Sequence, residues 1–132
     1  MSISDLNVLL VEDDQNVAIT LHNMLMEMGV SNVYDATNGV EALDLFHEAP
    51  DSISLVICDW NMPEKTGIEV LEEIRRTNDN MPFLMVTARA DEASVLKAKE
   101  CNVSAYICKP FSYDELKKKV NHIIDHWSVC AD

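Results

Sequence analysis

The sequence predicts an α/β fold in which five strand–helix units form an open, doubly wound parallel sheet. Short, almost continuously apolar runs alternate along the chain with longer segments of helical periodicity. Continuous apolarity is typical of strands that are covered on both faces, as in a parallel sheet. The length of 132 residues suits a single domain, and no linker or internal repeat interrupts the alternation. Short connections with right-handed crossovers then place helices on both faces.

Five apolar runs are the expected strands. They cover residues 6–11, 32–36, 55–58, 83–86 and 105–108. The second run is the weakest, because the polar side chains of Asn32 and Asp35 interrupt it. Ligands of such sheets bind beyond the carboxyl ends of the strands, so the residues that follow these runs are the candidates for function.

Each run is followed by apolar residues three and four positions apart, the spacing of one face of a helix. The four clear stripes are Val17, Leu21, Met24, Leu25 and Met28; Val40, Leu43 and Phe46; Ile68, Leu71 and Ile74; and Leu116, Val120, Ile123, Ile124 and Trp127. We expect Gly29 to end the first helix and Pro50 to stop the second. Ser112 and Glu115 form a capping box that begins the last helix.

The segment 91–101 has the poorest helical stripe. Its apolar positions are mostly small or isolated, namely Ala93, Val95, Leu96 and Ala98. We expect a helix there as well, held less firmly than the others because it has little apolar surface to bury.

Charge excludes two classes of partner. Ten basic residues stand against 23 acidic ones, a net charge of −13. Generic binding to nucleic acids or anionic membranes needs clustered Lys and Arg, so we expect neither partner. The chain has no apolar run of the roughly 18 residues that a membrane span needs and no basic, apolar leader, so we expect a cytoplasmic protein.

The four cysteines give no sign of a metal or disulfide framework. They are scattered along the chain without a C-x-x-C pair. Cys58 and Cys108 lie in apolar runs, and we interpret both as small core residues.

Polar and charged side chains follow four of the five runs. They are Glu12, Asp13 and Asp14 after the first, Asp59 after the third, Thr87 after the fourth and Lys109 after the fifth. Asp14 is placed to cap the first helix. Two carboxylates about 4 Å apart repel by roughly 4 kcal/mol at an effective dielectric near 20, so the remaining acids favour a cation. Oxygen ligands with positions left for water suit Mg²⁺.

The same residues form a cradle for a phosphoryl group. Lys109 supplies a fixed positive charge, Thr87 a hydroxyl donor, and Asp59 a carboxylate that can attack phosphorus to give an acyl phosphate. Taken singly, each of these residues has an ordinary structural interpretation as a cap, a turn or a loop residue. Their occurrence together on four strand ends favours the phosphoryl site.

The motifs around these residues resemble those of the receiver domains of two-component response regulators. They are Val11-Glu12-Asp13, Asp59-Trp60-Asn61-Met62-Pro63, Val86-Thr87-Ala88 and Tyr106-Ile107-Cys108-Lys109-Pro110-Phe111. The resemblance spans residues 6–127, so a single receiver domain is expected to fill the chain, 1–132. It implies a flavodoxin-like sheet with strand order 2-1-3-4-5.

The resemblance assigns roles at the metal and at the phosphorus. Asp59 matches the phosphoacceptor and a metal ligand. Asp13 matches the direct Mg²⁺ ligand, Glu12 acts through water, and the backbone carbonyl of Asn61 matches a further ligand. Lys109 matches the lysine that pairs with the phosphoryl oxygens, and its bond to Pro110 is typically cis in the family.

The resemblance also implies a switch. Thr87 matches the hydroxyl that moves onto the phosphoryl group, Ala88 the small residue that leaves room for it, and Tyr106 the aromatic ring whose rotamer follows. Two departures stand out. Asn102 occupies the position of a usual glycine, where it can still adopt a left-handed turn, and Arg89 occupies a position that tunes phosphoryl lifetime.

The implied function is that of a phosphorylation-activated switch. A sensor histidine kinase donates the phosphoryl group, and the domain signals by binding a downstream protein, with chemotaxis and the flagellar motor switch as the expected setting. The partner face is expected to include Tyr106, Lys117 and Lys119. Only residues 128–132 follow the last helix, so we expect no output domain. We expect a monomer, and no enzyme beyond its own phosphoryl transfer and autodephosphorylation.

Four alternatives stay open at this point. A phosphorelay intermediate, or a receiver cut from a longer regulator, would have the same motifs. An aspartyl-phosphate phosphatase usually has a second Asp two residues after the nucleophile, where this chain has Asn61. A flavodoxin-type electron carrier needs a Ser/Thr/Gly-rich loop after the first strand, where this chain has three acids.

Overall fold

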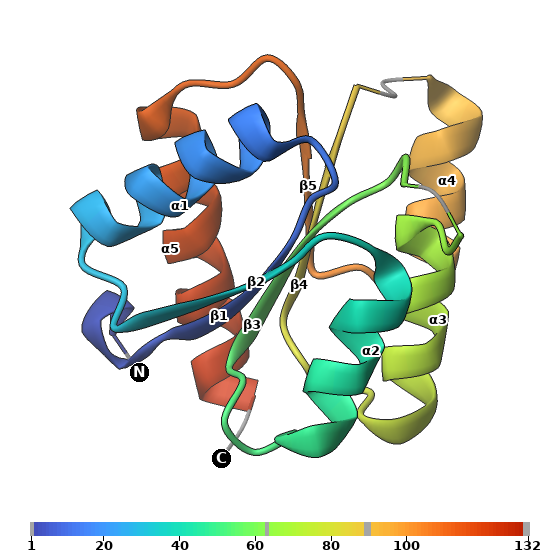
Figure 1. Ribbon diagram of the computed structural model, residues 1–132, viewed down its shortest axis with the longest axis horizontal. Helices are drawn as coiled ribbons and strands as arrows, with labels where there is room; N and C mark the ends of the chain where they lie inside the picture. The colour runs from blue at the N-terminus through green and yellow to red at the C-terminus, as the bar shows by residue number, and fades with distance from the viewer. Residues whose placement is uncertain (1, 63, 89–90, 131–132) are drawn as a thin grey trace.

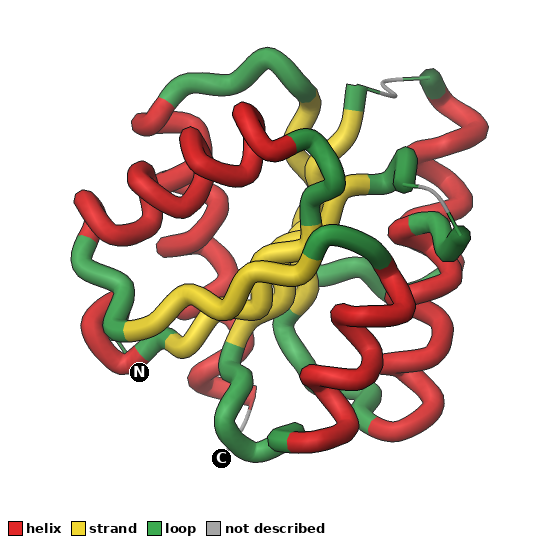
Figure 2. Tube along the Cα trace, viewed as in Figure 1, coloured by secondary structure: helices red, strands yellow, loops and turns green. Residues whose placement is uncertain are grey.

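The computed structural model describes residues 2–62, 64–88 and 91–130, with the backbone alone at 92 and 127–130. Arg89 and the side chain of Trp127, which the sequence singled out, therefore lie outside the described part of the chain. Figure 2 shows the strands gathered side by side in the centre, with helices around them.

One parallel sheet contains all the strands of the described residues, in the order β2-β1-β3-β4-β5. Their bounds are β1 (Asn7–Val11), β2 (Asn32–Ala36), β3 (Leu55–Asp59), β4 (Phe83–Thr87) and β5 (Ala105–Cys108). The predicted fold class and strand order are confirmed. β3 and β4 each run one residue beyond the expected apolar run, so Asp59 and Thr87 belong to the sheet itself.

Helices cover both faces of the sheet. They are α1 (Gln15–Met28), α2 (Gly39–Glu48), α3 (Gly67–Thr77), α4 (Glu92–Glu100) and α5 (Tyr113–Cys130), preceded by a short 3-10 helix, η1 (Ile3–Asp5). Figure 1 shows α1 and α5 on one side of the sheet and α2, α3 and α4 on the other. Each side encloses its own cluster of buried apolar side chains, and β1, β3 and β4 contribute to both. This pattern explains why the central strands are continuously apolar.

Local signals begin and end these helices as expected. The Asp14 carboxylate accepts hydrogen bonds from the backbone N–H groups of Asn16 and Val17 at 2.9 and 3.3 Å, which makes it the cap of α1. Gly29 ends α1 in a left-handed conformation with φ of 103°. The Ser112 hydroxyl accepts from the N–H of Glu115, whose carboxylate accepts from the N–H of Ser112, as a capping box requires.

The buried face of α2 differs from the expected stripe. Gly39, Ala42, Leu43 and Phe46 are buried, whereas Val40 is 41% exposed. These buried positions follow the i, i+3, i+4, i+7 spacing of one helix face, and Val40 lies one position off it. The small residues Gly39 and Ala42 make up half of that face, and a stripe of large apolar side chains does not include them.

Helix α4 has the small buried apolar face that its sequence predicted. Of its apolar residues, Ala98 is fully buried and Leu96 is 52% exposed, and the polar Ser94 occupies the other buried position. The predicted left-handed residue after α4 is confirmed at Asn102, with φ of 64°.

The two cysteines of the apolar runs are not equally buried. Cys58 on β3 is fully buried as expected, but Cys108 is only half-buried because β5 is an edge strand with a neighbour on one side alone. Within the described residues, no helix combines the length and the apolar character that crossing a membrane requires.

Candidate functional site

Three carboxylates meet at the carboxyl edge of the sheet. The pairing of β1 with β3 places Val11 beside Cys58, so the residues that follow them, Glu12 and Asp59, become neighbours. One carboxylate oxygen from each of Glu12, Asp13 and Asp59 lies within 4.8 Å of the others. Asp13 is exposed, while Glu12 and Asp59 are buried. Asp14 keeps its carboxylate on the cap of α1, as predicted.

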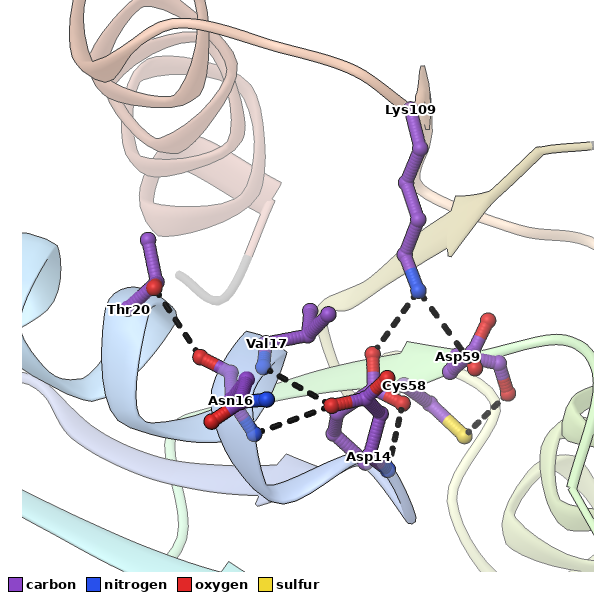
Figure 3. Close-up of polar contacts among 8 residues, drawn as sticks. Asp14, Asn16, Val17, Thr20, Cys58, Asp59 and Lys109 are labelled. Carbon is purple, nitrogen blue, oxygen red and sulfur yellow. Dashed lines mark hydrogen bonds and ion pairs between the residues drawn. The ribbon is translucent and has the colours of Figure 1, made fainter.

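One lysine reaches this acidic group from the end of β5, which lies two strands away from β3 in the sheet. The Nζ of Lys109, which follows β5, lies 2.9 Å from Oε1 of Glu12 and 3.5 Å from Oδ2 of Asp59. Figure 3 shows its extended side chain with the ammonium group directed at Asp59. The backbone N–H of Lys109 donates to the carbonyl of Thr87 at 2.8 Å, and the Lys109–Pro110 peptide bond is cis. Four residues from three strand ends therefore share one small site.

The buried carboxyl of Glu12 has an altered acidity. Burial raises its pKa from 4.5 to about 7; the hydrogen bond from Lys109 opposes the rise, and the neighbouring Asp59 adds to it. Burial by itself lowers the pKa of Lys109, but the carboxylates of Glu12 and Asp59 outweigh it and raise that pKa overall. Among the described residues, three acids and one amine meet at the site.

Both oxygens of the Glu12 carboxylate have partners in the protein. Oε1 accepts from Lys109, and Oε2 accepts from the backbone N–H of Asp14 at 3.3 Å. The backbone N–H of Glu12 in turn donates to the carbonyl of Ala36 at 3.1 Å. Glu12 is thus anchored in place, while Asp13 beside it remains open to solvent.

Gly67 supports Asp59 from below, a contact that the sequence did not reveal. A Cβ atom added to Gly67 would lie 2.4 Å from the carbonyl oxygen of Asp59 and 2.9 Å from the Cα of Trp60. The N–H of Gly67 donates to the carbonyl of Trp60 at 2.8 Å. The start of α3 can pack this closely against the end of β3 only because residue 67 has no side chain. The available signal was a glycine shortly after the loop that carries the candidate nucleophile.

Thr87 ends the strand next to that of Asp59, and Ala88 follows it. The register pairs Asp59 with Val86, which places the fully buried Thr87 one residue further along the adjacent strand. Ala88 is exposed and, with Lys109 and Phe111, lines a groove between α1 and the loop after β5. Asn61 is exposed in the loop after β3.

The expected partner face is only partly brought together. Tyr106 is half-buried and lines a groove between α4 and α5 together with Lys119. Lys117 is exposed and does not line this groove. Its ammonium lies 6.0 Å from the centre of the Tyr113 ring. Residues 117 and 119 are separated by about 200° around a helix, so they cannot share one face.

A family model for the response regulator receiver domain matches residues 8–121. The chain belongs to the receiver domain family. The resemblance seen in the sequence motifs is thus confirmed. The matched residues of this receiver domain include all the strand ends that build the site.

Named relatives agree with the family match. The receiver domain is 35% identical over 121 residues to the chemotaxis protein CheY homolog of Campylobacter jejuni, covering 90% of this chain and 92% of that protein. It is 32% identical over 122 residues to the chemotaxis protein CheY of Pseudomonas aeruginosa, covering 91% and 97%. A response regulator receiver domain protein of Clostridium thermocellum superposes with a TM-score of 0.88 at 25% identity, covering 95% of this chain and 98% of that one.

Proposed function

We propose that this receiver domain is a phosphorylation-activated response regulator that accepts a phosphoryl group on Asp59. The observation that carries the proposal is the position of the Asp59 carboxylate, 3.5 Å from the Lys109 ammonium and within 4.8 Å of two further carboxylates. A nucleophile, a cation for the transferred oxygens and a set of hard oxygen ligands therefore coincide at one point.

The proposed reaction is a displacement at phosphorus. A carboxylate oxygen of Asp59 attacks the phosphorus of a phosphohistidine on a sensor histidine kinase, and a new O–P bond forms as the P–N bond breaks. The electron pair of the broken bond returns to the imidazole nitrogen. Because the other ring nitrogen carries a proton, the histidine leaves as neutral imidazole, and Asp59 becomes an aspartyl phosphate. Lys109 stabilises the negative charge on the equatorial oxygens.

The acidic group fits Mg²⁺, the ion that the family implies. Three acids are met by one lysine, and the available donors are carboxylate oxygens, with the backbone carbonyl of Asn61 in the adjoining loop. We propose Asp13, Asp59 and the Asn61 carbonyl as the ligands. Because both Glu12 oxygens already have protein partners, Glu12 suits a contact through water. The ion would supply positive charge that balances the phosphoryl oxygens.

The proposed output is a shift between two packings of the molecule. A phosphoryl group on Asp59 would attract the Thr87 hydroxyl, and the small side chain of Ala88 would leave room for the phosphoryl group. The Tyr106 ring would then turn inward. The groove lined by Tyr106 and Lys119 would then change its affinity for a downstream protein. Because the curated relatives are chemotaxis proteins, we propose that this partner belongs to the flagellar motor switch. We further propose a monomeric, cytoplasmic domain with its core at 6–127.

Phosphotransfer from a small donor tests the assignment. Incubation with acetyl phosphate and Mg²⁺ should add one hydroxylamine-labile phosphoryl group to the wild type, measured by intact mass, and none to Asp59→Asn. Asp51→Asn, at an exposed acid away from the site, should label like the wild type. Undiminished labelling of Asp59→Asn would exclude Asp59 as the acceptor.

Partner capture tests the output. Beryllofluoride-treated protein should retain a motor or other target protein that untreated protein does not, and Tyr106→Ala should weaken that retention. Equal retention in both states would contradict the proposed switch. Repeated transfer from this domain to a second histidine would instead support a phosphorelay intermediate.

A further inference from the structure

Two histidines on α5 form a pair to which the proposed function assigns no role. His122 and His126 are one turn apart and both exposed, so they project from the same face of the helix. Their ring centroids are 4.0 Å apart with an angle of 35° between the ring planes. The buried positions of this part of the helix are Ile123 and Ile124, so the pair makes no contribution to the core.

A backbone contact settles which nitrogen of His126 is free. Its Nδ1 lies 3.0 Å from the carbonyl oxygen of His122. A carbonyl oxygen can only accept a hydrogen bond, so Nδ1 carries the proton and the neutral ring presents the Nε2 lone pair outward. Metal-bound histidines in proteins are held in the same way, because a hydrogen bond from the other ring nitrogen fixes the tautomer and the orientation of the ligand.

We propose that His122 and His126 form a two-histidine site for a borderline divalent transition ion, with Zn²⁺ as the representative. Imidazole nitrogens select Zn²⁺, Cu²⁺ or Ni²⁺ over Mg²⁺, which prefers oxygen. Two histidines at i and i+4 on a helix are a known arrangement for binding one zinc ion. With only two protein ligands, the ion keeps open positions for water or for an atom of a bound partner.

The charges around the pair act in both directions. Lys118 and Lys119 precede it by one turn and oppose a cation, while Asp125 lies between the two histidines in the sequence and favours one. The net charge of −13 attracts cations to the molecule as a whole. Because His122 also lines the groove with Tyr106 and Lys119, a bound ion would add positive charge at the edge of that groove.

Zinc titration of the untagged, metal-free chain tests the proposal. Calorimetry in excess Mg²⁺, which competes for the acidic site, should detect one zinc ion per chain. His122→Gln and His126→Gln should each weaken this binding more than about tenfold, since removing even an outer partner of a metal ligand costs 10- to 100-fold. His47→Gln, at an exposed histidine on α2, should leave it unchanged.

Three results would overturn the proposal. The first is zinc binding that survives in both His122→Gln and His126→Gln, and the second is binding abolished by Asp13→Asn, which would place the ion at the acidic site. The third is zinc binding that only Cys130→Ser abolishes, which would assign the ion to that cysteine. Circular dichroism of each variant without metal checks that the helix is intact. A paramagnetic ion gives an independent readout, because Ni²⁺ should broaden the ring resonances of His122 and His126 before those of His47.

Discussion

Glu12 shows how burial and charge compete at a single residue. Its carboxyl group is buried, and the raised pKa of about 7 means that the folded chain holds a proton there at a pH where the unfolded chain has released it. Between pH 4.5 and 7 the folded state therefore binds more protons than the unfolded state, so this residue makes stability fall as the pH rises.

Glu12→Gln tests that sign. In EDTA, the stability of the variant relative to the wild type should increase from pH 5 to pH 8, because glutamine has no proton to lose. Urea unfolding at several pH values measures the difference. A relative stability that stays flat or decreases over this range would mean that Lys109 outweighs burial and that the pKa of Glu12 is not raised.

Gly67 gives a prediction in which the sign of the effect is decisive. On helix propensity alone, Gly67→Ala would stabilise the chain by up to about 1 kcal/mol. The contact of 2.4 Å that a Cβ would make with the Asp59 carbonyl predicts the opposite, a loss of about 1–3 kcal/mol. Chemical unfolding distinguishes the two. Slower labelling by acetyl phosphate should accompany the loss, because the end of β3 must shift. A more stable Gly67→Ala variant would show that the close packing of residue 67 against the Asp59 carbonyl is not required.

At the scale of elements, α4 has the smallest buried apolar face of the three helices, α2, α3 and α4, that lie on one side of the sheet in Figure 1. Its fully buried apolar contact is the small side chain of Ala98, whereas the α3 face buries Ile68, Val70, Leu71 and Ile74. Its beginning depends on Asp91, whose carboxylate accepts from the backbone N–H and the hydroxyl of Ser94, both at 2.9 Å.

Hydrogen exchange should reveal this difference. Amides of α4 should exchange faster than those of α3 under the same conditions, since local opening costs little where few apolar contacts are lost. Asp91→Ala should accelerate α4 further and leave α3 unchanged, while Asp91→Asn, which keeps a capping oxygen, should have a smaller effect. Equal protection of α3 and α4 would argue against a loosely held element at this face.

Helices and strands were largely predictable, and the exceptions have physical causes. Periodicity finds large side chains, so it located the buried faces of α1 and α3 but misplaced Val40 on α2, where Gly39 and Ala42 share the buried face. Apolar runs do not tell an edge strand from a central one, which is why Cys108 on β5 is only half-buried. Capping signals are local, and those at Asp14 and Ser112 were found.

The site required knowledge of the whole molecule. Sequence placed Glu12, Asp59 and Lys109 at strand ends, and the strand order then brought them together. The support that Gly67 gives to Asp59 could not be predicted, because it depends on the distance between two backbone segments. The separation of Lys117 from Lys119 follows from helix geometry, because two positions along a helix are about 200° apart. Which of the two lines the groove could not be predicted, since it depends on the face of α5 that meets the sheet.

Binding of Mg²⁺ should stabilise the whole molecule. A ligand that binds only the folded state at about 100 times its dissociation constant adds roughly 2.7 kcal/mol, so the melting temperature should rise with Mg²⁺ concentration. Asp13→Asn should remove most of that rise, and Asp51→Asn should preserve it. An equal rise in all three proteins would mean that the ion binds outside the acidic group.

The contact between Lys109 and Glu12 joins residues 97 positions apart in the chain. A ribosome that has made the first four strands has produced every acid of the site but not the amine that partly neutralises them. If Asp59 accepts phosphorus as proposed, the complete site therefore forms only after β5 has been made and has joined the sheet edge.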